Sequence, residues 1–146
     1  MIWVVDASVA VRWFIEQECH PHADFVLERM LSQPDRFAVP ELFGFEVYAV
    51  LNRLHPQASE VFLKGMIPVL HCGILRYPMT EGLVRQASVF VNKGLTGYDA
   101  CYAALAKELK GTWLTFDDKA HKLIQKAKVS HALSTSLPPN WPGQQR

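Results

Sequence analysis

The stretch VVDASVAVRW, residues 4–13, joins an apolar strand to an amphipathic helix through one aspartate, Asp6. The β-branched residues before Asp6 predict a strand over residues 2–5, and the apolar spacing after it predicts a helix over residues 8–16. A charged side chain therefore stands where a buried strand ends. Ligands of open parallel sheets bind outside the carboxyl ends of the strands, so other carboxylates that meet Asp6 would mark a site.

The alternation of strand and helix continues along the chain. Short β-branched or aromatic runs predict four more strands, at 37–39, 73–78, 112–116 and 129–133. Helical periodicity predicts six more helices, at 22–33, 41–54, 58–70, 80–93, 98–109 and 118–127. Because parallel neighbours need long connections, we expect an α/β fold with helices on both faces of a parallel sheet. Residues 1–134 form the domain, and residues 135–146, with three prolines and no periodicity, form an irregular tail.

Composition narrows the class of protein. A chain of 146 residues is long enough for one core. Its net charge of +1 is well below that of a typical basic nucleic-acid-binding protein. If the protein binds a polyanion, a local basic patch or a metal ion must provide the contact. No run approaches the roughly 18 apolar residues of a membrane span. Three cysteines without a CxxC pair favour a reducing compartment, and we expect a soluble cytoplasmic protein with no membrane association.

Four carboxylates stand where elements begin or end, and each also has a simpler explanation. Asp6 and Asp99 precede or open predicted helices, where an N-cap accounts for an aspartate. Ser8 offers an alternative cap that would leave Asp6 free. Asp117 and Asp118 both follow the strand at 112–116. We expect Asp117 to face the crevice and Asp118 to cap the helix, although either remains open as the fourth acid.

Glu46 lies in the middle of an apolar helical stripe. Its neighbours three and four residues away are Leu42, Phe43, Ala49 and Val50. This position predicts that Glu46 faces the core. Because burying an ionised carboxylate is costly, Glu46 must be paired, neutralised or bound to a metal. A salt bridge, for example to Arg53, is the alternative to a metal.

Four acids are now candidates for one site: Asp6, Glu46, Asp99, and Asp117 or Asp118. They converge if the strands that end at Asp6 and Asp117 are neighbours. Two such charges ~4 Å apart repel by about 4 kcal/mol at an effective dielectric of 20, so four need a cation. Carboxylate oxygens suit Mg²⁺ or Mn²⁺, and magnesium keeps water ligands whose pKa it lowers. The CHPH stretch at residues 19–22 is too crowded, and lacks the distant partners, for a structural zinc site.

Four segments, VVDASVAVRWF, VPELFGFEVYAVL, LTGYDACYAALA and LTFDDKAHKL, together resemble the PIN domain family of metal-dependent ribonucleases, and within it the VapC-type toxins of toxin–antitoxin pairs. The resemblance implies a three-layer α/β/α fold with a five-stranded parallel sheet in the order 3-2-1-4-5 and about seven helices. It also implies that the catalytic acids, which hold one or two Mg²⁺ or Mn²⁺ ions, are Asp6, Glu46, Asp99 and Asp117. Ser8 and Thr115 are then expected behind these acids as hydrogen-bond partners.

The activity implied by the resemblance is endonucleolytic cleavage of RNA by a metal-activated water. Arg12 is the candidate for binding substrate phosphates, with Lys93 and Lys107 as further cations. A homodimer and a cognate antitoxin are the partners that the resemblance implies. Two alternatives remain: a PIN nuclease that processes RNA without an antitoxin, and a non-catalytic metal-binding or interaction domain. The sequence does not identify the RNA that is cut.

Overall fold

A single parallel sheet organises the protein, whose computed structural model describes residues 1–143. The five strands are β1 Trp3–Val5, β2 Phe37–Pro40, β3 Leu75–Tyr77, β4 Thr112–Thr115 and β5 Ser130–Ala132. Their order is β3-β2-β1-β4-β5 and every pairing is parallel, so the predicted class and strand order are confirmed. Val5 of β1 lies opposite Leu114 of β4. Asp6 and the residues after Thr115 therefore leave the sheet at the same edge.

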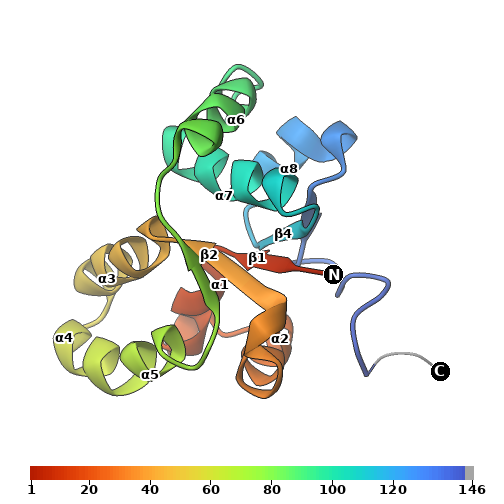
Figure 1. The fold of residues 1–146 in the computed structure, drawn as a ribbon. Helices are drawn as coiled ribbons and strands as arrows, with labels where there is room; N and C mark the ends of the chain where they lie inside the picture. The colour runs from red at the N-terminus through yellow and green to blue at the C-terminus, as the bar shows by residue number, and fades with distance from the viewer. Residues whose placement is uncertain (144–146) are drawn as a thin grey trace.

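Helices cover both faces of the sheet. Within residues 1–143 they form seven segments when the continuous pair α4 and α5 counts as one: α1 Ala7–Ala10, α2 Pro21–Ser32, α3 Leu42–Leu54, α4 Ala58–Val61, α5 Ile67–Leu70, α6 Glu81–Val91, α7 Gly97–Glu108 and α8 Asp118–Ile124. In Figure 1, α1 to α5 lie on one face of the sheet, and α6, α7 and α8 lie on the other. The expected three-layer α/β/α arrangement is confirmed.

Two of the predicted helices are interrupted. The helix predicted over residues 8–16 is wrong in its second half, because α1 ends at Ala10 and continues as a 3-10 turn over Val11–Trp13. There the indole of Trp13 donates a hydrogen bond to the carbonyl of Ala23 in α2 at 2.8 Å, which ties the turn to that helix. The predicted 58–70 helix contains a π-helical turn over Phe62–Met66. Pro68 follows this turn, and proline supplies no N–H for a regular α-helical ladder.

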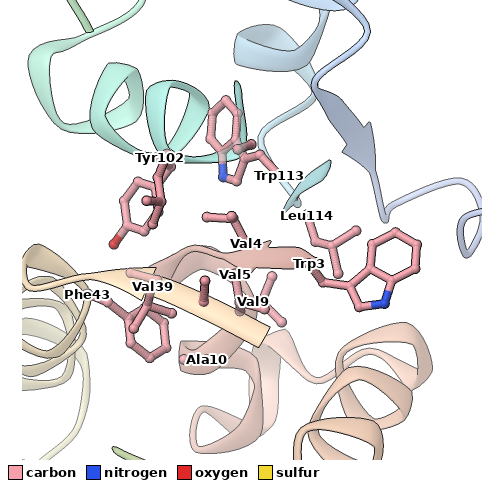
Figure 2. Close-up of a cluster of buried hydrophobic side chains, with 14 of the residues drawn as sticks. Trp3, Val4, Val5, Val9, Ala10, Val39, Phe43, Tyr102, Trp113 and Leu114 are labelled. Carbon is pink, nitrogen blue, oxygen red and sulfur yellow. The ribbon is translucent and has the colours of Figure 1, made fainter. Parts of the chain in front are cut away.

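The core surrounds β1, whose three residues are all buried. Figure 2 shows Val4 pointing toward Tyr102 and Trp113, with Val9, Ala10 and Phe43 on the other side of the strand. α7 is buried on all sides from residue 100 to residue 106, and its alanines let it approach the sheet closely. This tight packing places the first turn of α7 against the carboxyl ends of the strands.

The segment after β5 has no helix or strand up to residue 143, yet it packs on the sheet. Trp141 is 3% exposed, and its ring lies 5.2 Å from that of Trp3 and 6.3 Å from that of Phe37. The last residues of the predicted irregular tail, 144–146, lie outside the described residues. None of the helices within residues 1–143 combines the length and apolarity needed to cross a membrane.

Candidate active site

Asp6 is held at the end of β1 by four hydrogen bonds. Its Oδ1 accepts from the backbone N–H and the hydroxyl of Ser8, at 3.0 and 2.5 Å. Its Oδ2 accepts from Thr115 Oγ1 at 2.7 Å and from Trp113 Nε1 at 3.1 Å. Asp6 also caps α1 through the Ser8 contact, so Ser8 does not replace it as the cap. Both carboxylate oxygens are therefore fixed in direction.

Burial sets the protonation of Asp6. Loss of solvation raises the pKa of Asp6 to about 7, although the hydrogen bonds from Ser8 and Thr115 act in the opposite direction. The charges of Asp99 and Glu46 raise the pKa further. The carboxyl of Asp6 is 4% exposed. Without a compensating cation it thus resists ionisation near neutral pH.

Ser8 and Thr115 connect the ends of β1 and β4 behind Asp6. Ser8 Oγ accepts a hydrogen bond from the backbone N–H of Phe116 at 3.0 Å and lies 3.4 Å from Thr115 Oγ1. Thr115 Oγ1 in turn accepts from the backbone N–H of Asp117 at 3.0 Å. The two hydroxyls that the resemblance places behind the acids thus contact Asp6 directly and fix the loop that carries Asp117.

Glu46 projects from α3 and is half-buried. Its Oε1 accepts a hydrogen bond from the hydroxyl of Tyr102 at 2.8 Å. Burial raises the pKa of Glu46, the Tyr102 hydrogen bond opposes this shift, and the charge of Asp99 adds to it. Among residues 1–143 Glu46 makes no salt bridge, so the alternative pairing with Arg53 is not present. The prediction that Glu46 faces the core is wrong in detail, because it lines a pocket wall.

Asp99 is not the cap of its helix. Thr96 caps α7, and its hydroxyl accepts from the backbone N–H of Asp99 at 3.2 Å. The N-cap explanation for Asp99 is therefore wrong. Burial raises the pKa of Asp99, and the charge of Asp117 raises it further. A side-chain hydrogen bond with Thr96 lowers the pKa of the Asp99 carboxyl, against these two larger effects.

Asp117, not Asp118, caps α8. Asp117 Oδ1 accepts from the backbone N–H of Ala120 at 2.9 Å, while Asp118 is exposed and accepts a hydrogen bond from the hydroxyl of Ser134. The expectation that Asp118 caps the helix is wrong, because Ser134 from the segment after β5 engages it. Asp117 both caps α8 and lines the pocket described next.

The four acids line one open pocket of about 290 Å³ at the carboxyl edge of the sheet. Its polar lining consists of Asp6, Ser8, Arg12, Glu18, Glu46, Arg53, Asp99 and Asp117. A larger hollow of about 900 Å³ lies between α3 and β3, but its only charged residues are Glu41 and Arg76. The smaller pocket is therefore the one equipped for chemistry on a charged substrate.

The donor set of this pocket suits a hard divalent cation. As the side chains stand, no three His, Cys, Asp or Glu residues within 1–143 are grouped closely enough to hold an ion, which includes the CHPH stretch. The chemistry nevertheless fits, because four carboxylates line one pocket. Burial, and to a smaller extent the charges of neighbouring acids, raise the pKa of Asp6, Glu46 and Asp99. Magnesium and manganese favour such oxygen donors, and a magnesium ion held by Asp6, Glu46, Asp99 and Asp117 would retain water ligands.

Arg12 lies at the rim of the pocket. Its guanidinium stands 4.3 Å from the centre of the Phe116 ring, and its Nη1 is 3.5 Å from the carbonyl of Glu18. Its Nε is buried and has no hydrogen-bond partner among residues 1–143. This geometry orients a cation toward the acidic pocket and leaves donors for an anionic ligand.

Sequence reasoning missed the aromatic donors beneath the pocket. Trp113 precedes Thr115 by two residues, so the two-residue period of β4 puts both on the same face. Tyr102 follows Asp99 by three residues, which places both on the same side of α7. These spacings were the available signals, but a tryptophan or tyrosine inside an apolar run is ordinarily interpreted as core packing.

A family model described as the PIN domain matches residues 3–126, a range that includes every residue lining the pocket. The chain belongs to the PIN domain family. No curated protein sequence matches this PIN domain.

Solved structures share the fold of this PIN domain at low sequence identity. FitAcB from Neisseria gonorrhoeae aligns with a TM-score of 0.69 and 17% identity, over 93% of this chain and 100% of that one. A toxin-antitoxin complex from Klebsiella pneumoniae aligns with a TM-score of 0.62 and 14% identity, over 88% of this chain and 95% of that one. VapC20 from Mycobacterium tuberculosis, described as a sarcin-ricin-loop-cleaving toxin, gives 0.60 and 15%, over 78% and 87%. At such identities the likeness supports the fold.

Proposed function

We propose that this PIN domain is a Mg²⁺- or Mn²⁺-dependent endoribonuclease, acting in the cytoplasm as the toxin of a VapC-type toxin–antitoxin pair. The observation that carries the proposal is the gathering of Asp6, Glu46, Asp99 and Asp117 on one pocket at the carboxyl edge of the sheet. Membership of the PIN family and a fold shared with proteins described as toxins support it.

The four acids are suited to hold the ion and to manage protons around it. A divalent ion bound there lowers the pKa of water and offsets phosphate charge. Hydrolysis joins a water oxygen to phosphorus and breaks the bond to the 3′ oxygen, which leaves 5′-phosphate and 3′-hydroxyl ends. The attacking water loses a proton to the acidic cluster, whose carboxylates line the same pocket. The departing 3′ oxygen gains a proton from solvent.

Two arginines on the pocket wall are suited to hold the substrate. Arg12 and Arg53 both line the pocket that contains the acids. A guanidinium binds phosphate oxygens through two parallel N–H groups. We assign Arg12 to the scissile or an adjacent phosphate because it stands at the rim beside Phe116.

The test is incubation of purified protein with total RNA in Mg²⁺, in Mn²⁺ and in EDTA. Wild-type protein cleaves in either metal and not in EDTA, and Asp6→Asn abolishes cleavage. Asp118→Asn is the matched control, since it removes a neighbouring exposed carboxylate outside the pocket lining. The 5′ ends of the fragments are accessible to a phosphate-dependent exonuclease.

Other outcomes select the alternatives. If wild type does not cleave RNA and Asp6→Asn leaves cell growth unchanged relative to wild type, the protein is a non-catalytic binding domain. If it cleaves RNA but its expression does not arrest growth and no neighbouring gene encodes an antitoxin, it is an RNA-processing nuclease. Growth arrest that a co-expressed neighbour reverses supports the toxin assignment.

We further propose a homodimer and an antitoxin partner. The hollow between α3 and β3 is lined in part by Phe45, Tyr48 and Phe62, and Phe45 is 78% exposed. Exposed apolar surface of this kind marks a contact with another protein chain. Light scattering after gel filtration measures the oligomeric state, and a monomeric mass at micromolar concentration contradicts the dimer.

A further inference from the structure

The positive charge of the chain is concentrated near its carboxyl end. Six of the eight lysines fall between residues 107 and 128, and that stretch contains three acids, Glu108, Asp117 and Asp118. The formal charge of the whole chain is only +1. Six of the fifteen lysines and arginines therefore lie in this one stretch, and the fold decides whether they are also close in space.

The fold gathers four of these lysines at the amino edge of the sheet. Lys107 and Lys110 stand at the end of α7, just before β4 begins, while Lys126 and Lys128 stand in and after the 3-10 turn that precedes β5. β4 and β5 are neighbours, and the backbone N–H of Trp113 donates to the carbonyl of Val129 at 2.8 Å. All four lysines are exposed. We call these four residues the lysine cluster.

Acids within residues 1–143 do not neutralise the lysine cluster. The salt bridges among these residues join Lys64 to Glu60 and Arg85 to Glu81, so neither involves the cluster. Glu108, the acid nearest in sequence, is directed toward α6, where a Cβ on Gly82 would lie 2.9 Å from its Oε1. The cluster therefore presents unpaired charge to solvent.

Two members of the cluster have a backbone conformation that disfavours lysine. The φ angles of Lys110 and Lys128 are 54° and 58°, in the left-handed region. Glycine or asparagine is the usual residue after a helix in this conformation, because a Cβ there is strained. Lysine at both positions therefore carries a conformational cost that glycine would avoid.

The cluster stands at the opposite edge of the sheet from the pocket. Lys110 and Asp117 are seven residues apart on either side of β4, which is at most roughly 23 Å at about 3.3 Å per residue. One RNA strand must therefore extend along the full height of the sheet to contact both the pocket and the lysine cluster. Lys107, a candidate for substrate binding at the pocket from sequence, therefore lies too far from the acids for that role.

We propose that the lysine cluster binds phosphates of an RNA strand outside the catalytic pocket, so that long RNA is held at two places; this inference rests on the proposed function. Lysines are depleted in interfaces between proteins, whereas they are the main source of affinity for a phosphate backbone. The flexible ammonium groups imply contacts without sequence preference.

The test compares affinities in the Asp6→Asn background, which binds without cutting. The variant Lys107→Ala/Lys110→Gly/Lys126→Ala/Lys128→Gly is expected to bind an RNA of about 50 nucleotides about 10-fold more weakly at moderate salt. The slope of log affinity against log salt falls by up to about 3, at roughly 0.7 per single-strand phosphate contact. The preference for long RNA over a tetranucleotide falls by a similar factor. Lys64→Ala, which removes an exposed lysine paired with Glu60, leaves these values unchanged.

Stability separates the proposal from a folding defect. Lys110→Gly/Lys128→Gly relieves two strained residues, so its melting temperature equals or exceeds that of wild type while its RNA affinity falls. Suppose that the four-lysine variant binds long RNA with unchanged affinity and salt slope while wild type cleaves RNA. The proposed role of the lysine cluster is then wrong, and the proposed nuclease function is unaffected. If polyglutamate displaces RNA from the lysine cluster as effectively as unlabelled RNA does, the assignment of the cluster to RNA is also overturned. Failure of wild type to cleave or bind any RNA removes both proposals.

Discussion

The indole Nε1 of Trp113, in the middle of β4, donates a hydrogen bond to Oδ2 of Asp6 at 3.1 Å, and the two residues are 107 positions apart in the chain. The ring of Trp113 stacks on that of Tyr102, with centroids 6.3 Å apart and planes 11° from parallel. Tyr102 in turn donates to Glu46. A buried aromatic pair therefore supports two of the four carboxylates from below.

Trp113→Phe is expected to slow catalysis while the protein still folds. The variant keeps an aromatic ring at this fully buried position but removes one of four donors to Asp6. A hydrogen bond to a charged group is worth about 1.5–3 kcal/mol, so the cleavage rate falls by about 10-fold or more. Trp3→Phe is the control, because Trp3 is also buried but packs on Trp141. Equal rates in the two variants at saturating metal contradict a positioning role for Trp113.

Tyr102→Phe is expected to shift the pH dependence of cleavage. The hydroxyl of Tyr102 holds the pKa of Glu46 down against the effect of burial. Without this donor the pKa of Glu46 rises, so the carboxylate ionises at higher pH and the acidic limb of the pH–rate profile moves to higher pH. A lower rate with an unmoved acidic limb indicates only a packing defect.

The sheet could be predicted from sequence because its strands are short, β-branched and buried. Residues 2–5 and 112–116 read as strands without further information, and a parallel arrangement brings their carboxyl ends together. The meeting of Asp6 and Asp117 at one pocket then depends on β1 and β4 being neighbours, and the family resemblance supplied that order. Local signals and topology together account for most of the site.

The remaining details depend on contacts that local signals do not contain. Asp117 and Asp118 are equally good caps by sequence, and the hydroxyl of Ser134 decides between them. The early end of α1 follows from the bond between Trp13 and Ala23. In each case the contact joins the predicted element to a residue outside it, Ser134 or Ala23, which no periodicity within the element records.

The stability of the metal-free protein should fall as pH rises. The pKa of Asp6 is about 7 in the folded state and 3.8 when unperturbed, so the folded protein binds more protons between these values. The contribution of Asp6 to the free energy of unfolding is therefore largest below pH 3.8, its unperturbed pKa, and it decreases as the pH rises toward about 7. In EDTA the melting temperature of wild type falls by roughly 5–10 °C between pH 5 and pH 8. Asp6→Asn flattens this dependence, and an equal slope in both proteins contradicts the assignment.

Metal binding should strengthen with pH over the same range. Asp6 must lose its proton before it can compensate a cation, and its pKa lies near 7. The apparent affinity for Mn²⁺ is expected to rise about tenfold per pH unit below pH 7 and to level off above it. Isothermal titration from pH 5.5 to pH 8.5 measures this, with Asp118→Asn as a control that retains the profile. An Mn²⁺ affinity that does not change with pH would show that the ion binds away from Asp6.

Gly111→Ala should destabilise the fold where β4 begins. A Cβ at residue 111 would lie 2.3 Å from the carbonyl oxygen of Ile2. That carbonyl accepts a hydrogen bond from the backbone N–H of Thr112 at 3.0 Å, next to the pairing of β1 with β4. The strands must separate to admit it, at a cost of about 2 kcal/mol or more. Gly97→Ala is the matched control, since nothing lies within 4 Å of a Cβ there and alanine favours the first turn of α7. We expect denaturant melts in EDTA to show a lower midpoint for Gly111→Ala and an unchanged or higher one for Gly97→Ala. Similar midpoints in the two variants mean that residue 111 has room for a Cβ beside the carbonyl of Ile2, which contradicts the contact at 2.3 Å.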